Sequence, residues 1–138
     1  MKVTVVPAST KTGQAVIGHL LKSHNSDLAV VGIYRDLAKV PETFKSNPLF
    51  EARQGDVASP DTLDFAGSDV VVTMSPPLLF SPGDPIAGAK QLAENVREGV
   101  IRSGTVRRLI YISSMGAQYE RGMVGEITHS KVRYYNTH

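Results

Sequence analysis

The chain has 138 residues, 41% of them hydrophobic and 20% charged, and its formal net charge is +2. This length supports one domain with a sizeable core and excludes two. The lack of cysteine excludes disulfides, thiolate catalysis and cysteine-ligated zinc, and no apolar run resembles a membrane span or a signal-peptide core. We therefore expect an intracellular, cytoplasmic protein with no membrane partner.

The basic residues and histidines do not indicate a nucleic-acid or metal site. The local basic cluster of Arg102, Arg107 and Arg108 lies near the end of a predicted helix, where the helix dipole favours positive charge. A nucleic-acid surface would need a longer basic stripe with interleaved aromatic residues. The four histidines lack the spacing of metal ligands. We expect no nucleic-acid partner and no bound metal.

The first half of the chain alternates apolar runs with amphipathic or irregular segments. The valine-rich run at 2–6 predicts a strand buried on both faces, and the one-sided apolar residues of 13–22 predict a helix. Residues 28–34 predict a second strand, and 37–45 is irregular or short-helical. Residues 50–54 predict a third, weaker strand that closes at a Gly-Asp pair.

In the next segment, capping and turn signals separate the predicted elements. Ser59 followed by Pro60 predicts the start of a short helix that runs to Ala66. Residues 69–74 predict a fourth strand, and the proline-rich stretch at 76–85 predicts a loop.

The best-formed helical pattern lies at 86–103, where apolar residues recur at three- and four-residue steps and Gly104 stands at the C-cap position. Residues 108–113 predict a fifth strand. This alternation of strands and helices predicts a doubly wound parallel sheet of about five strands in the order 3-2-1-4-5, with helices on both faces. In such a sheet a ligand lies beyond the carboxyl ends of strands one and four.

Four stretches resemble a known family: VTVVPASTKTGQAV at the first strand and helix, VGIYRD at the second strand, QGDV after the third, and NVREGVIRSGTVRRLIYISSMGA over the long helix and fifth strand. Through them the chain resembles the N-terminal half of an atypical short-chain dehydrogenase/reductase of the NmrA-like kind. The resemblance implies a Rossmann-like NAD(P)-binding domain over 1–127, with 128–138 as an irregular tail.

The C-terminal substrate region of that family is missing from this sequence. Members carry a further strand and a small region that closes over the substrate. We therefore expect a natural short form, a gene shortened by a frameshift near Glu126, or a fragment. An uncovered edge strand and apolar helix faces would favour self-association into a homo-oligomer.

The first loop departs from the family pattern, which typically reads T-G-A-T-G-K-T-G. Those glycines allow a tight turn, a close backbone approach to the pyrophosphate, and close packing of helix on strand. Here Pro7 and Thr10 replace the first two glycines. The resemblance implies that the cofactor phosphates are bound by Ser9, Thr10, Lys11, Thr12 and Gly13. Two interpretations stay open: a loop that still binds a dinucleotide, and a remodelled connection on an inherited fold.

Arg35 closes the second strand, where NAD-preferring folds usually carry an acid for the ribose hydroxyl. An arginine suits the 2′-phosphate of NADP, and the resemblance implies this role. We therefore expect NADP(H) to be preferred over NAD(H). The alternative is a solvated arginine paired with Asp36.

Further cofactor contacts are expected where the other strands end. Asp56 and Val57 match a family segment that lies against the adenine, although Asp56 has an equally good interpretation as a turn cap. Residues at the ends of strands four and five are expected to line the pocket, or simply to end their strands: Met74, Ser75, Pro76, Ser113 and Ser114.

The sequence assigns no catalytic residue. The wider superfamily pairs a tyrosine with a lysine four residues later, and the lysine lowers the tyrosine pKa. None of the five tyrosines here has a lysine at that spacing, although NmrA-like members often lack the pair.

Three functions remain under these observations. The first, which we favour, is an NADP-preferring oxidoreductase that acts on a small carbonyl, quinone or enone. The second is a non-catalytic module that senses the dinucleotide pool or docks on a partner. The third is a truncated, degenerate form with weakened cofactor binding or none.

Overall fold

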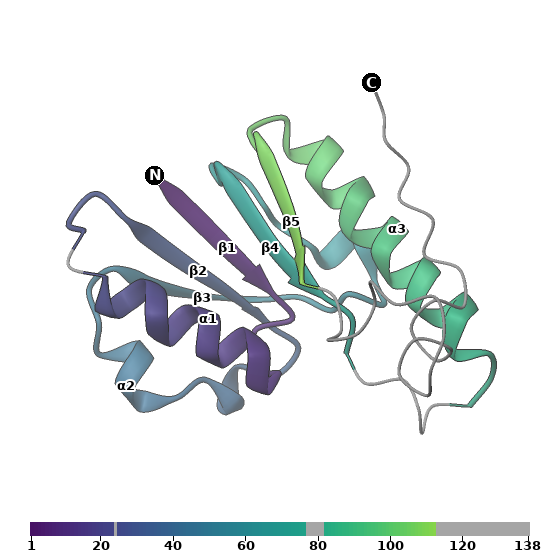
Figure 1. The fold of residues 1–138 in the computed structure, drawn as a ribbon, viewed down its shortest axis with the longest axis horizontal. Helices are drawn as coiled ribbons and strands as arrows, with labels where there is room; N and C mark the ends of the chain where they lie inside the picture. The colour runs from purple at the N-terminus through teal and green to yellow at the C-terminus, as the bar shows by residue number, and fades with distance from the viewer. Residues whose placement is uncertain (24, 77–81, 113–138) are drawn as a thin grey trace, which may run out of the picture.

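A computed structural model describes residues 1–23, 25–76 and 82–112. Within them, five parallel strands form one sheet in the order β3-β2-β1-β4-β5 (Figure 1). This order confirms the predicted doubly wound, Rossmann-like fold. The strands are β1 (Lys2–Val6), β2 (Ala29–Tyr34), β3 (Phe50–Gln54), β4 (Val70–Met74) and β5 (Arg108–Ile112).

Helices cover both faces of the sheet. Ile17 of one helix and Phe44 of another pack with Val5 on one face, whereas Val96 packs with Phe65 on the other. The helical elements are α1 (Lys11–Lys22), η1 (Leu37–Lys39), α2 (Glu42–Lys45), η2 (Pro60–Thr62) and α3 (Pro85–Ser103). Among these elements, no helix is long and apolar enough to cross a membrane.

β1 is buried on both faces, as its valine-rich sequence predicts. Val3 and Val5 belong to the cluster on the α1 side, and Val6 belongs to the cluster on the α3 side. Thr4 is also fully buried, and its hydroxyl is hydrogen-bonded to the Ser68 hydroxyl at 2.6 Å. β1 is therefore the central strand of the sheet, and burial on both faces fixes the position of its carboxyl end.

The start of α1 lies two residues earlier than the sequence predicts. The helix begins at Lys11 because the Thr10 hydroxyl accepts a hydrogen bond from the Gly13 N–H and so acts as the N-cap. The long helix and its C-cap are confirmed, since α3 ends at Gly104 in the left-handed conformation with φ of 65°. Within α3, Val96 is buried, but Ile86 near the start is 41% exposed.

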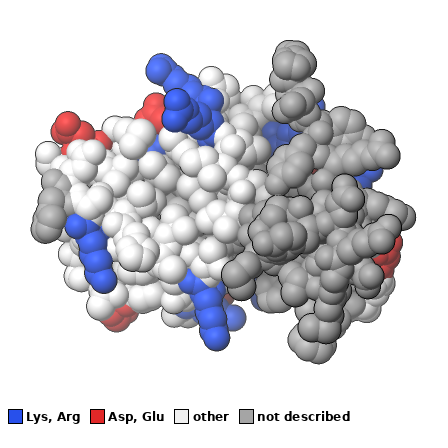
Figure 2. Space-filling model, viewed as in Figure 1, with Lys and Arg blue, Asp and Glu red and all other residues white. Residues whose placement is uncertain are grey.

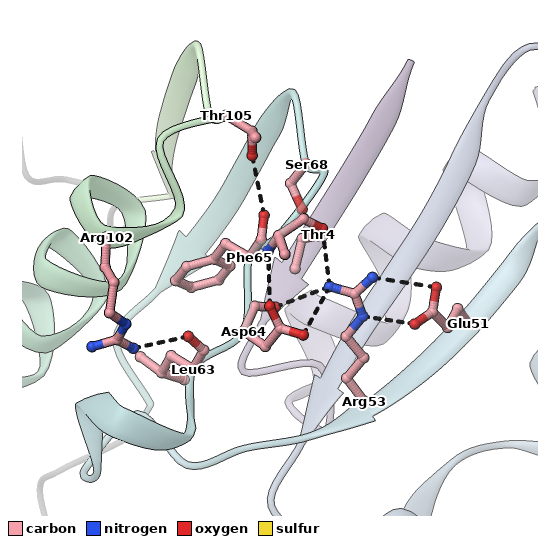
Figure 3. A network of polar contacts seen from close by, with 10 residues as sticks. Thr4, Glu51, Arg53, Leu63, Asp64, Phe65, Ser68, Arg102 and Thr105 are labelled. Atoms are coloured by element: carbon pink, nitrogen blue, oxygen red, sulfur yellow. Dashed lines mark hydrogen bonds and ion pairs between the residues drawn. The ribbon is translucent and has the colours of Figure 1, made fainter.

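The helix predicted over 59–66 is wrong. Only η2 forms there, Ser59 makes no side-chain cap hydrogen bond, and Leu63 and Phe65 turn into the core instead. Two arginines bind the backbone carbonyls of this segment (Figure 3). Arg53 donates to the carbonyls of Asp64 and Ala66, both at 3.2 Å, and Arg102 donates to those of Pro60 at 2.6 Å and Leu63 at 3.1 Å. These long-range bonds favour an extended path over a helix.

Candidate functional site

A cavity of about 160 Å³ opens at the carboxyl edge of the sheet, where the sequence predicts a ligand. A smaller pocket of about 10 Å³ adjoins it and shares Val57 and Pro76 with it. The larger cavity is lined by Val6, Pro7, Ser9, Thr10, Arg35, Asp36, Lys39, Gly55, Asp56, Val57 and Pro76. The smaller pocket adds Thr73, Met74, Ser75, Leu92, Ala93, Val96 and Tyr111.

The structure brings most of the predicted site residues together. Six of them line the larger cavity: Ser9, Thr10, Arg35, Asp56, Val57 and Pro76. Met74 and Ser75 line the smaller pocket. Lys11, Thr12 and Gly13 form the first turn of α1 beside the larger cavity without lining it. Ser113 and Ser114 lie outside the described residues, as does the tail at 128–138.

The N-terminus of α1 supplies donors at the larger cavity. The Gly13 N–H is taken by the Thr10 hydroxyl at 2.9 Å, whereas the N–H groups of Lys11 and Thr12 have no partner among the described residues. The Thr10 hydroxyl in turn lies 3.2 Å from the Pro7 carbonyl and 3.3 Å from the Met74 sulfur. This side chain therefore holds the loop together, and an anion would be bound by backbone N–H groups and the helix dipole.

Gly13 allows the first turn of α1 to pack closely against the preceding loop. A Cβ atom built on it would lie 2.5 Å from the Pro7 carbonyl oxygen, so no other residue fits without a shift. The loop is also tied to β2, because the N–H of the buried Ala8 donates to the Ile33 carbonyl at 2.9 Å. The loop therefore packs tightly between β1 and α1.

Two cationic residues line the larger cavity, together with Asp36. Arg35 follows β2, and Lys39 ends η1. The Asp36 carboxylate accepts a hydrogen bond from the Ala38 N–H at 2.9 Å and so caps η1. The ion pairs among the described residues do not include Arg35, so the alternative Arg35–Asp36 pair is not formed there.

Asp56 also lines the larger cavity, and it closes a turn. Its carboxylate accepts a hydrogen bond from the Ala58 N–H at 2.9 Å, and its own N–H donates to the Thr62 hydroxyl at 2.9 Å. The turn-cap interpretation is thus confirmed for one carboxylate oxygen. The same residue lines the cavity, so the geometry is compatible with both roles.

Sequence reasoning missed three residues at this edge. Lys39 was not predicted as a site residue, because the sequence analysis gives residues 37–45 only as irregular or short-helical. Tyr111 shares a 2.7 Å hydrogen bond with the Ser75 hydroxyl, and Asn95 of α3 donates to the Val57 carbonyl at 2.9 Å. A polar residue inside an apolar helical stripe was the available signal for Asn95.

Among the described residues, the ionisable groups outside the two pockets do not form a second site. Burial raises the pKa of Tyr34 to about 12, and a hydrogen bond from Arg53 lowers the pKa of Glu51. No cluster of potential metal ligands occurs in the described part of the chain. On the face shown in Figure 2, Lys and Arg side chains stand apart with uncharged surface between them.

Several solved structures share this fold, among them the following three oxidoreductases. Triphenylmethane reductase from Citrobacter sp. is 24% identical with a TM-score of 0.72, and the match covers 94% of this chain and 42% of that one. An NADPH-dependent quinone oxidoreductase from Escherichia coli, solved with NADPH, is 22% identical with a TM-score of 0.68, over 91% of this chain and 41% of that one. An oxidoreductase from Lactococcus lactis is 18% identical with a TM-score of 0.70, and the match covers 94% of this chain and 57% of that one.

The chain spans about half the length of these structures, and their low identity shows the fold alone. No curated protein sequence gives a significant match. The family comparison goes further, because the NAD(P)H-binding family model matches residues 8–138, which include the N-terminus of α1, Arg35, Lys39 and the Asp56 turn. On that match, the chain belongs to the NAD(P)H-binding family.

Proposed function

We propose that this chain binds NADP(H) in preference to NAD(H) and forms the nucleotide-binding part of an NmrA-like oxidoreductase. The observation that carries the proposal is that Arg35 and Lys39, which both follow β2, line the same cavity. NAD has no phosphate at the ribose 2′ position, so two cations there would favour NADP.

The remaining residues fit the rest of such a cofactor. The start of α1 offers the free N–H groups of Lys11 and Thr12 to a pyrophosphate, and Gly13 lets the helix approach the loop closely. Asp56 and Val57 form the wall for the adenine, and Met74, Ser75 and Pro76 lead toward the nicotinamide side. When bound, NADPH supplies a hydride, and we propose a small carbonyl, quinone or enone as its acceptor.

A non-catalytic dinucleotide sensor is the second candidate, and one observation favours it. None of the five tyrosines is followed by a lysine four residues later, so the sequence lacks the usual proton-donating pair of the superfamily. This candidate predicts binding without turnover across a panel of carbonyl, quinone and enone acceptors. Clear turnover of any of them by the purified chain would exclude it.

Reversing the charge of Arg35 tests the proposed cofactor preference. Arg35→Glu should weaken NADPH binding at least about tenfold more than NADH binding, because the 2′-phosphate would then face a carboxylate. Arg97→Glu is the matched control, since Arg97 is an exposed residue of α3 that does not line either cavity. Equal losses for the two dinucleotides in Arg35→Glu would contradict the phosphate role.

A further inference from the structure

Asn95 is a buried polar residue on the core-facing side of α3, and both ends of its amide are hydrogen-bonded. The side chain is 4% exposed. Its nitrogen donates to the Val57 carbonyl at 2.9 Å, and its oxygen accepts from the Gln91 amide at 3.0 Å, one helical turn earlier. A buried amide is costly unless its polar atoms are paired, so this arrangement ties α3 to Val57 specifically.

Val57 is the point at which this bond acts on the site, because it lines both the larger cavity and the smaller pocket. The turn around it is held internally, since Asp56 accepts from the N–H groups of Ala58 and Ser59, both at 2.9 Å. Among the described residues, the Asn95 bond is the only hydrogen bond from α3 to residues 55–59. Val57 also packs against the apolar cluster that contains Val96 of α3, so Asn95 supplies the polar part of the attachment between turn and helix.

A second anchor on α3 acts on a different part of the same segment. Arg102 donates to the carbonyl of Leu63 (Figure 3) and to that of Pro60. Neither Pro60 nor Leu63 lines either cavity. Asn95 and Arg102 thus attach neighbouring stretches of one segment to one helix. Loss of either should loosen the segment, but only loss of the Asn95 bond should move the cavity wall.

We propose that Asn95 is a positioning residue for the nucleotide site. It fixes the Val57 carbonyl and thereby the Asp56–Val57 wall against which the adenine half of the dinucleotide lies. This role rests on the proposed binding of NADP(H). Because the wall is shared by NADPH and NADH, Asn95 acts on the affinity for both and leaves the preference set by Arg35 unchanged.

Two reciprocal substitutions separate the two bonds of the Asn95 amide. Asn95→Asp keeps an acceptor for Gln91 but places a carboxylate oxygen opposite the Val57 carbonyl. Gln91→Met removes the other bond and leaves the bond to Val57. Arg102→Met is the control for a loosened segment away from the cavity. Should Asn95→Asp fail to fold, Asn95→Ala removes the bond to Val57 without adding a charge.

Amide hydrogen exchange at Ala58 and Ser59 and titrations with NADPH and NADH give independent readouts. Asn95→Asp should speed exchange at both amides and weaken both dinucleotides about tenfold with their ratio unchanged. Gln91→Met and Arg102→Met should keep both affinities within about threefold of the parent.

Three other outcomes would count against these conclusions, each in a distinct way. Unchanged exchange in Asn95→Asp would overturn the positioning role. An equal loss of affinity in Arg102→Met would also overturn it, because the effect would then be general loosening. Faster exchange in a protein whose parent binds neither dinucleotide would overturn the proposed function itself and, with it, the nucleotide part of this inference.

Discussion

Gly13→Ala is the substitution for which the structure gives the sharpest expectation. A Cβ atom at this position would lie 2.5 Å from the Pro7 carbonyl oxygen and 3.0 Å from the Thr10 hydroxyl oxygen. Ordinary contact begins near 3.4 Å, so loop and helix would have to separate by about 0.9 Å at the first of these contacts. The same movement would stretch the N-cap hydrogen bond from the Gly13 N–H to Thr10.

The magnitudes favour a net loss of stability. Alanine is preferred over glycine in a helix by about 1 kcal/mol. Overpacking of this kind costs about 1–3 kcal/mol, and a weakened N-cap adds about 1 kcal/mol. We therefore expect Gly13→Ala to lower the free energy of unfolding by about 2 kcal/mol and to weaken NADPH binding at least tenfold, because the first turn of α1 moves.

Gly18 provides the matched control on the same helix. A Cβ atom there would meet the Phe44 ring at 3.9 Å, which is ordinary contact. Gly18→Ala should therefore raise the free energy of unfolding by about 0.5–1 kcal/mol and leave NADPH binding unchanged. Urea denaturation with equal m-values measures both variants. If Gly13→Ala proves as stable as Gly18→Ala, the packing argument for this glycine is refuted.

Two further predictions concern the buried Tyr34 hydroxyl and the hydrogen bonds and ion pair of Arg53. The Tyr34 hydroxyl is buried without a partner among the described residues, and its pKa rises from 10.0 to about 12, so the folded state keeps the proton after the unfolded chain has lost it. The free energy of unfolding therefore contains a contribution of roughly 3 kcal/mol from the protonated Tyr34. This contribution is fully present below pH 10 and is lost as the pH rises toward 12. Tyr34→Phe should abolish this loss and be about 1 kcal/mol more stable at pH 7 in urea titrations; a less stable variant would reveal a hidden partner. Arg53→Met removes two carbonyl hydrogen bonds and the pair with Glu51, and should cost about 1–3 kcal/mol. Lys45→Met, which breaks only an exposed pair with Glu42, should cost under about 0.5 kcal/mol, and similar losses for the two would contradict the role given to Arg53.

The sheet could be predicted from the sequence because its signals are local. Valine-rich runs marked β1, β2 and β4, and β3 matches its predicted bounds of 50–54 although it contains no valine. Gly104 marked the end of α3, where it adopts the positive φ that favours glycine. The predicted helix over 59–66 failed because its carbonyls are bound by Arg102, up to 42 residues away, and by Arg53. No local window contains that information.

The residues of the candidate site also fall into those that local sequence predicts and those that only the folded chain reveals. Arg35 could be predicted because it directly follows an apolar strand. Lys39 reaches the same cavity only because Asp36 caps η1, and this turn has no strong sequence signal. Asn95 binds Val57, which lies 38 residues away, so its partner appears only in the folded chain. The roles of Ser113 and Ser114 stay predictions, because both residues lie outside the described part of the chain.

A calorimetric titration of the 138-residue protein with NADPH and then with NADH tests the central claim most directly. The arrangement of Arg35, Lys39 and the α1 N-terminus predicts binding of NADPH in the micromolar range and weaker binding of NADH. No heat and no thermal stabilisation at millimolar concentrations of either dinucleotide would contradict it. The loop with Pro7 and Thr10 would then be a remodelled connection.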